Sequence, residues 1–217
     1  AHIVSHNLRS HSNNLAGLLD YQFREKPELL ELETTKMIKY AANNLKNTIA
    51  HLSEVALLNA NELKQLETVN LSVTIKNAIQ NVAALSKKAN VTILNNVKKD
   101  ISILGIHAYL DSIVLNFLTN GIKYQSKDAD SYVKLSIEKQ KEYMVLHVED
   151  NGLGIDLERH AKKLFGMYKT FHHHEDARGV GLFITKNQVE AMGGFIEVES
   201  EVGIGTTFKI FFKYEEN

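Results

Sequence analysis

The sequence contains no cysteine and no tryptophan, and proline occurs only once, at Pro27. Without cysteine the chain forms neither disulfides nor thiolate metal sites, and a reducing, cytoplasmic compartment is compatible with it. No apolar run approaches the roughly 18 residues of a membrane span, and no signal peptide opens the chain. We therefore expect these residues to make no membrane contact. Because the first residue is Ala1 and helical patterning has begun by Ile3, we expect a longer parent that could include a sensor or membrane segment.

A strong charge of one sign is also missing. The 217 residues include 25 basic and 26 acidic side chains, which gives a formal net charge of −1. A chain without a basic field is a poor partner for nucleic acid, so we exclude that class of ligand. The 44% of hydrophobic residues suffice for a substantial core. The length fits one domain together with a smaller helical element.

Residues 1–66 are predicted to form a helical hairpin that turns near Pro27. In its second half the apolar residues recur at spacings of three, four or seven, at Ile38, Ala41, Leu45, Ile49, Leu52, Ala56, Leu63 and Leu66. Such a seam needs a partner helix, and two copies of the hairpin complete a four-helix bundle. We therefore expect a homodimer.

Residues 67–217 are predicted to form an α+β sandwich of mixed helices and mostly antiparallel strands. The patterns predict helices at 72–87, 107–124 and 181–192, and strands at 91–97, 101–104, 133–137, 144–148, 195–199 and 207–214. The segment 156–178 contains Phe165 and three consecutive histidines, 172–174. Its length and mixed composition suggest a mobile cover over a ligand, with the histidines more plausible as a solvated loop than as a metal site.

One of these strands runs directly into a carboxylate and two glycines, Asp150, Gly152 and Gly154. A fixed carboxylate accepts hydrogen bonds from an exocyclic amino group, and glycines let the backbone lie against a flat ring. The pattern therefore suits the binding of a nucleotide base, although it is a weak signal by itself.

Further residues with phosphate and metal chemistry lie on either side. Asn116, Asn120 and Lys123 share one side of a predicted helix, where amide oxygens suit Mg²⁺ and an ammonium neutralises phosphate. Downstream, Arg178 and Gly179 precede a helix that is expected to begin near Gly181 and Leu182, where free amides at the helix start bind phosphate. The segment 203–207 is predicted to be a hairpin turn, with a second role at the site left open. No P-loop or dinucleotide-binding motif is present.

His6 is predicted to face away from the apolar stripe of its helix. With about 100° per residue, Leu8 and Leu15 lie at about 200° and 180° from it. A neutral imidazole has a lone pair for attack on phosphorus, and the product is labile enough to pass the phosphoryl group on. A plain exposed histidine is the alternative, and only the nucleotide-site pattern outweighs it.

Taken in this order, the motifs resemble those of the catalytic core of two-component sensor histidine kinases, in which a dimerisation and phosphotransfer hairpin precedes a Bergerat-type ATPase domain. The likeness covers nearly the whole chain. It implies autophosphorylation of His6 by ATP with Mg²⁺, and a response-regulator receiver domain whose aspartate takes the phosphoryl group. It also implies the nucleotide-site residues Asn116, Asn120 (the metal ligand), Lys123, Tyr124, Asp150, Gly152, Gly154, Phe165, Arg178, Gly179, Gly181, Leu182, Thr206 and Thr207.

One departure from the family pattern lies beside His6. The family usually has an acidic residue where this chain has Asn7 and a proline where it has His11. An amide fixes an imidazole tautomer but takes up no proton near neutral pH. Ser10 lies where the family often has a residue linked to phosphatase chemistry, so that activity stays open. A kinase-deficient nucleotide-binding dimer is therefore the main alternative. A hydrolysis-driven ATPase of the chaperone or topoisomerase kind is a weaker one.

Overall fold

The computed structural model divides into two compact units, Ala1–Leu63 and Lys64–Asn217. It describes residues 66–126, 130–166 and 181–214, and in the first unit residues 14, 17–26, 28, 29, 32, 34, 35, 38 and 42. Residues 17–25 are helical, and the Tyr21 hydroxyl donates to Glu25 Oε1 at 2.7 Å, one turn further on. The predicted turn at Pro27 lies outside the described residues. The predicted four-helix bundle requires two chains, so it stays a prediction.

The second unit is built on a five-stranded sheet with the strand order β2-β4-β5-β7-β6. These strands are β2 (Val91–Asn95), β4 (Ser131–Gln140), β5 (Tyr143–Asp150), β6 (Phe195–Glu201) and β7 (Gly205–Lys213). Only the β2–β4 pair is parallel, and the other neighbours are antiparallel. The prediction of an α+β domain with mostly antiparallel strands is confirmed.

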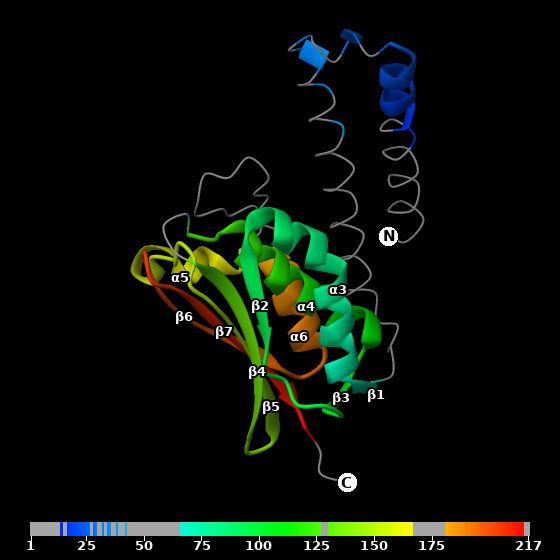
Figure 1. The fold of residues 1–217 in the computed structure, drawn as a ribbon. Coiled ribbons are helices and arrows are strands. Elements are labelled where there is room, and N and C mark those ends of the chain that lie inside the picture. Colours follow the sequence, from blue (N-terminus) through cyan, green and yellow to red (C-terminus); the bar gives the residue numbers. More distant parts are fainter. Residues whose placement is uncertain are drawn as a thin grey trace. The chain divides into compact units, whose positions relative to one another are not determined.

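Three helices cover one face of this sheet (Figure 1). They are α3 (Leu71–Ala89), α4 (His107–Lys123) and α6 (Gly181–Ala191). The α3 helix begins where the Asn70 side chain accepts from Val73 N at 3.0 Å, and it ends at Asn90 in the left-handed conformation. These are a typical N-cap and C-cap. All three helices were predicted within about two residues of their ends, which is the usual uncertainty of such boundaries.

Two elements were not predicted. The strand β1 (Glu67–Asn70) pairs with β3 (Ser102–Gly105) in a separate two-stranded sheet. The helix α5 (Leu157–Leu164) occupies the first part of the segment that was predicted to be a cover. The remainder of that segment, residues 167–180, lies outside the described residues. The helix was missed because α5 carries many charged side chains and only a narrow apolar stripe, which ends at the buried Leu164.

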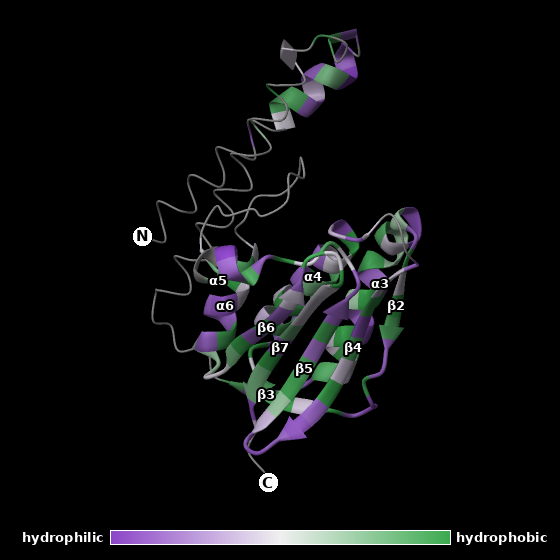
Figure 2. Ribbon diagram, turned by 90° about the vertical axis from the view of Figure 1, so that its left-hand side faces the viewer, coloured by the Kyte–Doolittle hydropathy of each residue, from purple (hydrophilic) through white to green (hydrophobic). Residues whose placement is uncertain are grey.

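The core fills the space between the helices and the sheet. On α4 the buried residues recur every three or four positions, at Leu110, Ile113, Val114, Phe117, Leu118, Gly121 and Ile122. On β4 the residues alternate, with Val133 and Leu135 fully buried while Lys134 and Ser136 lie on the other face. Figure 2 shows this alternation as repeated changes of hydropathy along β4. The face that packs against the helices is called the inner face below, and the opposite one the outer face.

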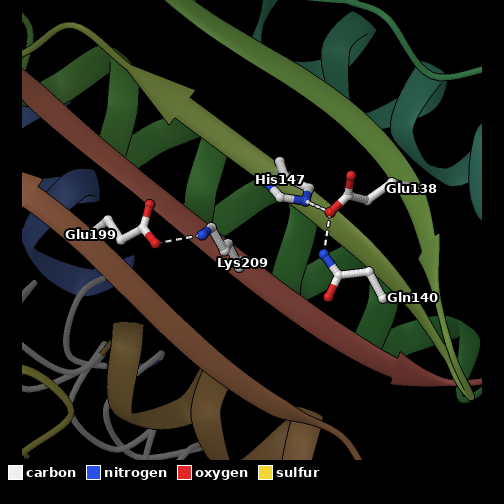
Figure 3. Close-up of polar contacts among 5 residues, drawn as sticks. All are labelled: Glu138, Gln140, His147, Glu199 and Lys209. Carbon is white, nitrogen blue, oxygen red and sulfur yellow. Dashed lines mark hydrogen bonds and ion pairs between the residues drawn. The ribbon is translucent and has the colours of Figure 1, made fainter.

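Cross-strand pairs and rings make up the outer face. His147 Nε2 lies 3.1 Å from Glu138 Oε1, which Gln140 also contacts, and Lys209 contacts Glu199 (Figure 3). Nearby, the rings of Phe195 and Phe211 stack at 4.1 Å, and Tyr143 meets both edge-on. Such pairs stabilise this face of the sheet, which none of the described helices covers. Within the part of the chain that the structure describes, no helix has the length and apolar character needed to cross a bilayer.

Candidate functional site

Asp150 is the last residue of β5 and lies at the end of the inner face. Its Oδ1 accepts from Gly152 N at 2.9 Å, and it also accepts from the backbone N–H of Thr206 on β7. Burial raises its pKa to about 6, although both backbone donors act in the opposite direction. A carboxylate that is held in place by two backbone groups is oriented before any ligand arrives. It is therefore suited to accept a hydrogen bond from a ligand amino group.

The two glycines that follow lie where no side chain fits. A Cβ on Gly152 would lie 2.3 Å from the carbonyl oxygen of Tyr124, and Gly154 (φ +66°) would place one 1.9 Å from that of Glu201. The Leu153 N–H between them donates to Tyr124 O at 2.9 Å, and Leu153 O accepts from Gly203 N at 2.9 Å. The loop is therefore held between the end of α4 and the β6–β7 turn. The turn that was predicted at 203–207 thus lies against the loop beside Asp150.

The α4 helix brings the predicted phosphate- and metal-binding residues to the same end of the domain. Asn116, Asn120, Lys123 and Tyr124 are all partly exposed. Lys123 Nζ lies 5.5 Å from the centre of the Tyr124 ring, and burial raises the pKa of the Tyr124 hydroxyl. Among the described residues, His, Asp and Glu side chains nowhere gather in threes that could hold a metal ion. An amide oxygen at Asn120 fits a metal whose remaining ligands are phosphate and water.

The start of α6 lies directly against this face of α4. The helix begins at Gly181, as predicted, and a Cβ there would lie 2.4 Å from Asn116 Oδ1. Leu182 packs against the core, and so does Phe165, which lies just after α5 with Lys186 Nζ 5.7 Å from its ring. Backbone amides at a helix start attract anions, so phosphate binding between α4 and α6 is chemically reasonable.

The structure separates the two threonines of β7. Thr206 is buried opposite Asp150, and its hydroxyl lies 2.8 Å from the Ser200 hydroxyl. Thr207 pairs with Glu149 and Glu199 in the register, so its side chain belongs to the outer face. Thr206 and Thr207 were both predicted to contact the nucleotide, and their side chains point to opposite faces because successive residues of a strand alternate.

Five predicted site residues lie outside the described residues: His6, Asn7, Ser10, Arg178 and Gly179. Three supporting residues were not predicted. The Asn151 side chain accepts from Tyr132 N at 2.8 Å and donates to Asp130 O, which ties the end of β5 to the start of β4. Ser200 accepts from Ile155 N at 2.8 Å, and Thr185 accepts from Asn116 Nδ2 at 2.7 Å. These partners are distant in sequence, so only the fold reveals them.

Comparison with known proteins agrees with this arrangement. Residues 105–216 match the family described as histidine kinase-, DNA gyrase B- and HSP90-like ATPases. Two curated relatives are the heme sensor protein HssS of Staphylococcus saprophyticus and the signal transduction histidine-protein kinase ArlS of Staphylococcus haemolyticus. HssS is 27% identical over 97% of this chain and 45% of its own length. ArlS is 26% identical over 97% of this chain and 47% of its own length.

The chain thus spans about half the length of each of these curated relatives. Among solved structures, the crystal structure of full-length ShkA in complex with AMPPNP superposes with a TM-score of 0.76. That match covers 99% of this chain and 46% of ShkA at 21% sequence identity, a level at which it supports the fold.

Proposed function

The chain belongs to the family of histidine kinase-, DNA gyrase B- and HSP90-like ATPases, and from that premise we propose that it is the catalytic core of a sensor histidine kinase. The family match begins at residue 105, whereas the two kinase relatives align with 97% of the chain. The alignment with these kinases therefore extends far upstream of residue 105, into the N-terminal segment. The family model itself does not reach that segment, so the match of the two kinase relatives there favours the kinase among the members of this family.

The nucleotide would lie between Asp150 and the facing surfaces of α4 and α6. The observation that carries this placement is the carboxylate of Asp150, fixed by the backbone N–H groups of Gly152 and Thr206. In this proposal Asp150 accepts from the adenine amino group, and the amides that begin α6 bind phosphate. Asn120 would hold Mg²⁺, which neutralises phosphate charge when it is bound.

His6 is the proposed phosphoryl acceptor. A nitrogen of the neutral imidazole attacks the γ-phosphorus, the bond from that phosphorus to the bridging oxygen breaks, and ADP leaves. The imidazole N–H proton is released to solvent or to a base, and Asn7 does not serve as that base because an amide takes up no proton near neutral pH. The phosphoryl group then passes to an aspartate carboxylate of a response-regulator receiver domain. We also propose that the N-terminal hairpins of two copies form the dimeric four-helix bundle.

Labelling with γ-labelled ATP tests this function. The wild-type protein with Mg²⁺ should acquire a label that is labile to acid and stable to alkali, as a phosphoramidate is, and His6→Gln should acquire none. His11→Gln is a matched control, because it changes a nearby histidine and should leave labelling intact. Full labelling of His6→Gln would contradict the assignment of the acceptor.

The identity of Asn7 favours one alternative, a nucleotide-binding dimer without kinase activity. Under that alternative the protein binds ATP but acquires no label at any ATP concentration or incubation time. Replacement of the amide by a carboxylate in Asn7→Asp would then restore labelling if the missing base is the cause. Nucleotide binding without labelling in either protein would contradict the kinase proposal as a whole.

A further inference from the structure

One of the hydrogen bonds between α4 and α6 lies near the start of α6, beside the candidate phosphate site. Asn116 Nδ2 donates to Thr185 Oγ1 at 2.7 Å, across 69 positions of sequence. Thr185 is only 1% exposed, so its hydroxyl exchanges little with water. A buried hydroxyl that accepts from an amide restricts that amide strongly, because breaking the bond leaves a buried polar atom without a partner.

The other end of the same amide is also restricted. Asn116 Oδ1 lies so close to Gly181 that a Cβ on that glycine would approach it to 2.4 Å. Gly181 and Thr185 are four residues apart on α6 and therefore lie on the same side of that helix. The amide is thus held by its nitrogen at Thr185, while its oxygen lies against the backbone at Gly181.

We propose that Thr185 is a positioning residue for nucleotide binding, which acts by fixing the orientation of the Asn116 side-chain amide. This inference rests on the proposed function, in which Asn116 contacts the nucleotide. The final torsion of an asparagine side chain is soft, so a free amide samples many orientations. Fixing it in advance removes an ordering cost from nucleotide binding. Thr185 itself has no contact with the nucleotide in this proposal.

A second bond between the same two helices provides a control. Gln188 Nε2 donates to Ser112 Oγ at 3.2 Å, one turn away from the Asn116–Thr185 bond on both helices. Loss of this bond in Ser112→Ala weakens the packing of α4 against α6 in a similar way. It leaves Asn116 untouched, so it separates a general effect on packing from a specific effect on the amide.

The experiment measures the affinity for a non-hydrolysable ATP analogue with Mg²⁺ by calorimetry. Thr185→Val keeps the shape and removes the hydroxyl, and we expect it to weaken the affinity about five- to tenfold, as one lost hydrogen bond does. Thr185→Ser keeps the hydroxyl and should stay within about twofold of wild type, and so should Ser112→Ala. On an Asn116→Ala background, Thr185→Val should cause no further loss, because the two residues act as one unit. Thr185→Ala, which also lacks the hydroxyl, replaces the valine variant if that protein does not fold.

Three affinity results would overturn the inference: an unchanged affinity in Thr185→Val, an equal loss in Ser112→Ala, or additive losses with Asn116→Ala. A direct observation of the amide separates this inference from the proposed function. The NMR signals of the Asn116 side-chain amide should shift and exchange faster with solvent in Thr185→Val. If the wild-type protein binds no nucleotide, the proposed function fails. Unchanged Asn116 amide signals in the valine variant would still overturn the role of Thr185.

Discussion

Two adjacent carboxylates, Glu149 and Asp150, show how differently the two faces of the sheet treat the same chemical group. Glu149 lies on the outer face, where Lys134 and the Tyr132 hydroxyl donate to it at 2.8 and 2.7 Å, and these contacts lower its pKa. Asp150 lies on the inner face, where burial raises its pKa to about 6. The shifts are opposite although the residues are neighbours in sequence.

This difference indicates which face of the sheet is organised to bind a ligand. On the outer face, charged side chains form ion pairs with side chains of neighbouring strands, as in Lys134–Glu149 and Lys209–Glu199. At the end of the inner face, Asp150 has backbone donors, and no cation of the described residues contributes to the shift of its pKa. A carboxylate whose charge is only partly compensated is poised for an external donor, and perturbed groups of this kind mark candidate functional sites.

The largest effect is expected on nucleotide affinity when the carboxylate of Asp150 is removed, with removal of the Glu149 carboxylate as the comparison. Asp150→Ala should weaken binding of an ATP analogue about 30- to 100-fold, the value of a charge-assisted hydrogen bond. Glu149→Ala should change the affinity less than about twofold, because its side chain points to the other face. Calorimetric titration of both variants with Mg²⁺ measures the difference. Equal losses in the two variants would show that the faces are not functionally distinct.

A smaller effect of opposite sign is expected on stability without nucleotide. The raised pKa of Asp150 means that its ionisation disfavours the folded state as the pH rises through about 4 to 6. Asp150→Asn should therefore stabilise the protein at pH 7.5, by about 1 to 2 kcal/mol after discounting for partial exposure, and this gain should shrink at pH 5. Urea denaturation at the two pH values measures it.

The matched variant Glu149→Gln should lower the stability at pH 7.5 by about 0.5 kcal/mol, because a partly exposed ion pair is lost. Because the pKa of Glu149 is lowered in the folded protein, its ionised side chain stabilises the fold at every pH above the ordinary pKa of glutamate. This stabilisation is lost only as the pH falls further. The deficit of this variant should therefore persist at pH 5, where the gain of Asp150→Asn has shrunk. A gain in stability from both variants would contradict the contrast between the faces.

The smallest effect is expected for the exposed pair on the outer face. Glu199→Gln removes the partner of Lys209, and Glu199 is 66% exposed. We expect a change below about 0.5 kcal/mol in the free energy of unfolding, which 1 M NaCl should abolish by screening. Denaturation at low and high salt measures this change. A loss as large as that of a buried group would mean that the outer face is covered in solution.

Periodicity of three to four residues, or of two, was enough to predict most of the second unit. It located α3, α4, α6 and the strands of the sheet, because each has one face in the core. It missed β1, which has four residues and only one of them fully buried, and α5, whose apolar stripe is narrow. The parallel pairing of β2 with β4 was also beyond prediction, since it depends on how distant segments meet in space.

The candidate site was predictable to the extent that its residues lie in short motifs. Asp150, Gly152 and Gly154 were found from adjacent positions, and Asn116 and Asn120 from helical spacing. The opposite orientation of the Thr206 and Thr207 side chains follows from strand alternation, although the same short motif suggested both residues. Thr185 was not predictable, since no local pattern distinguishes a threonine that accepts from an amide 69 positions away.

The position of β7 within the sheet determines when the domain becomes competent during synthesis. This strand is the last of the described strands in sequence, yet it is inserted between β5 and β6 and supplies the Thr206 N–H to Asp150. On the ribosome, every motif upstream of residue 205 is therefore present before the carboxylate has its second donor. A nascent chain that pauses before β7 has emerged would leave β5 and β6 as unpaired edges and would be vulnerable to misassembly.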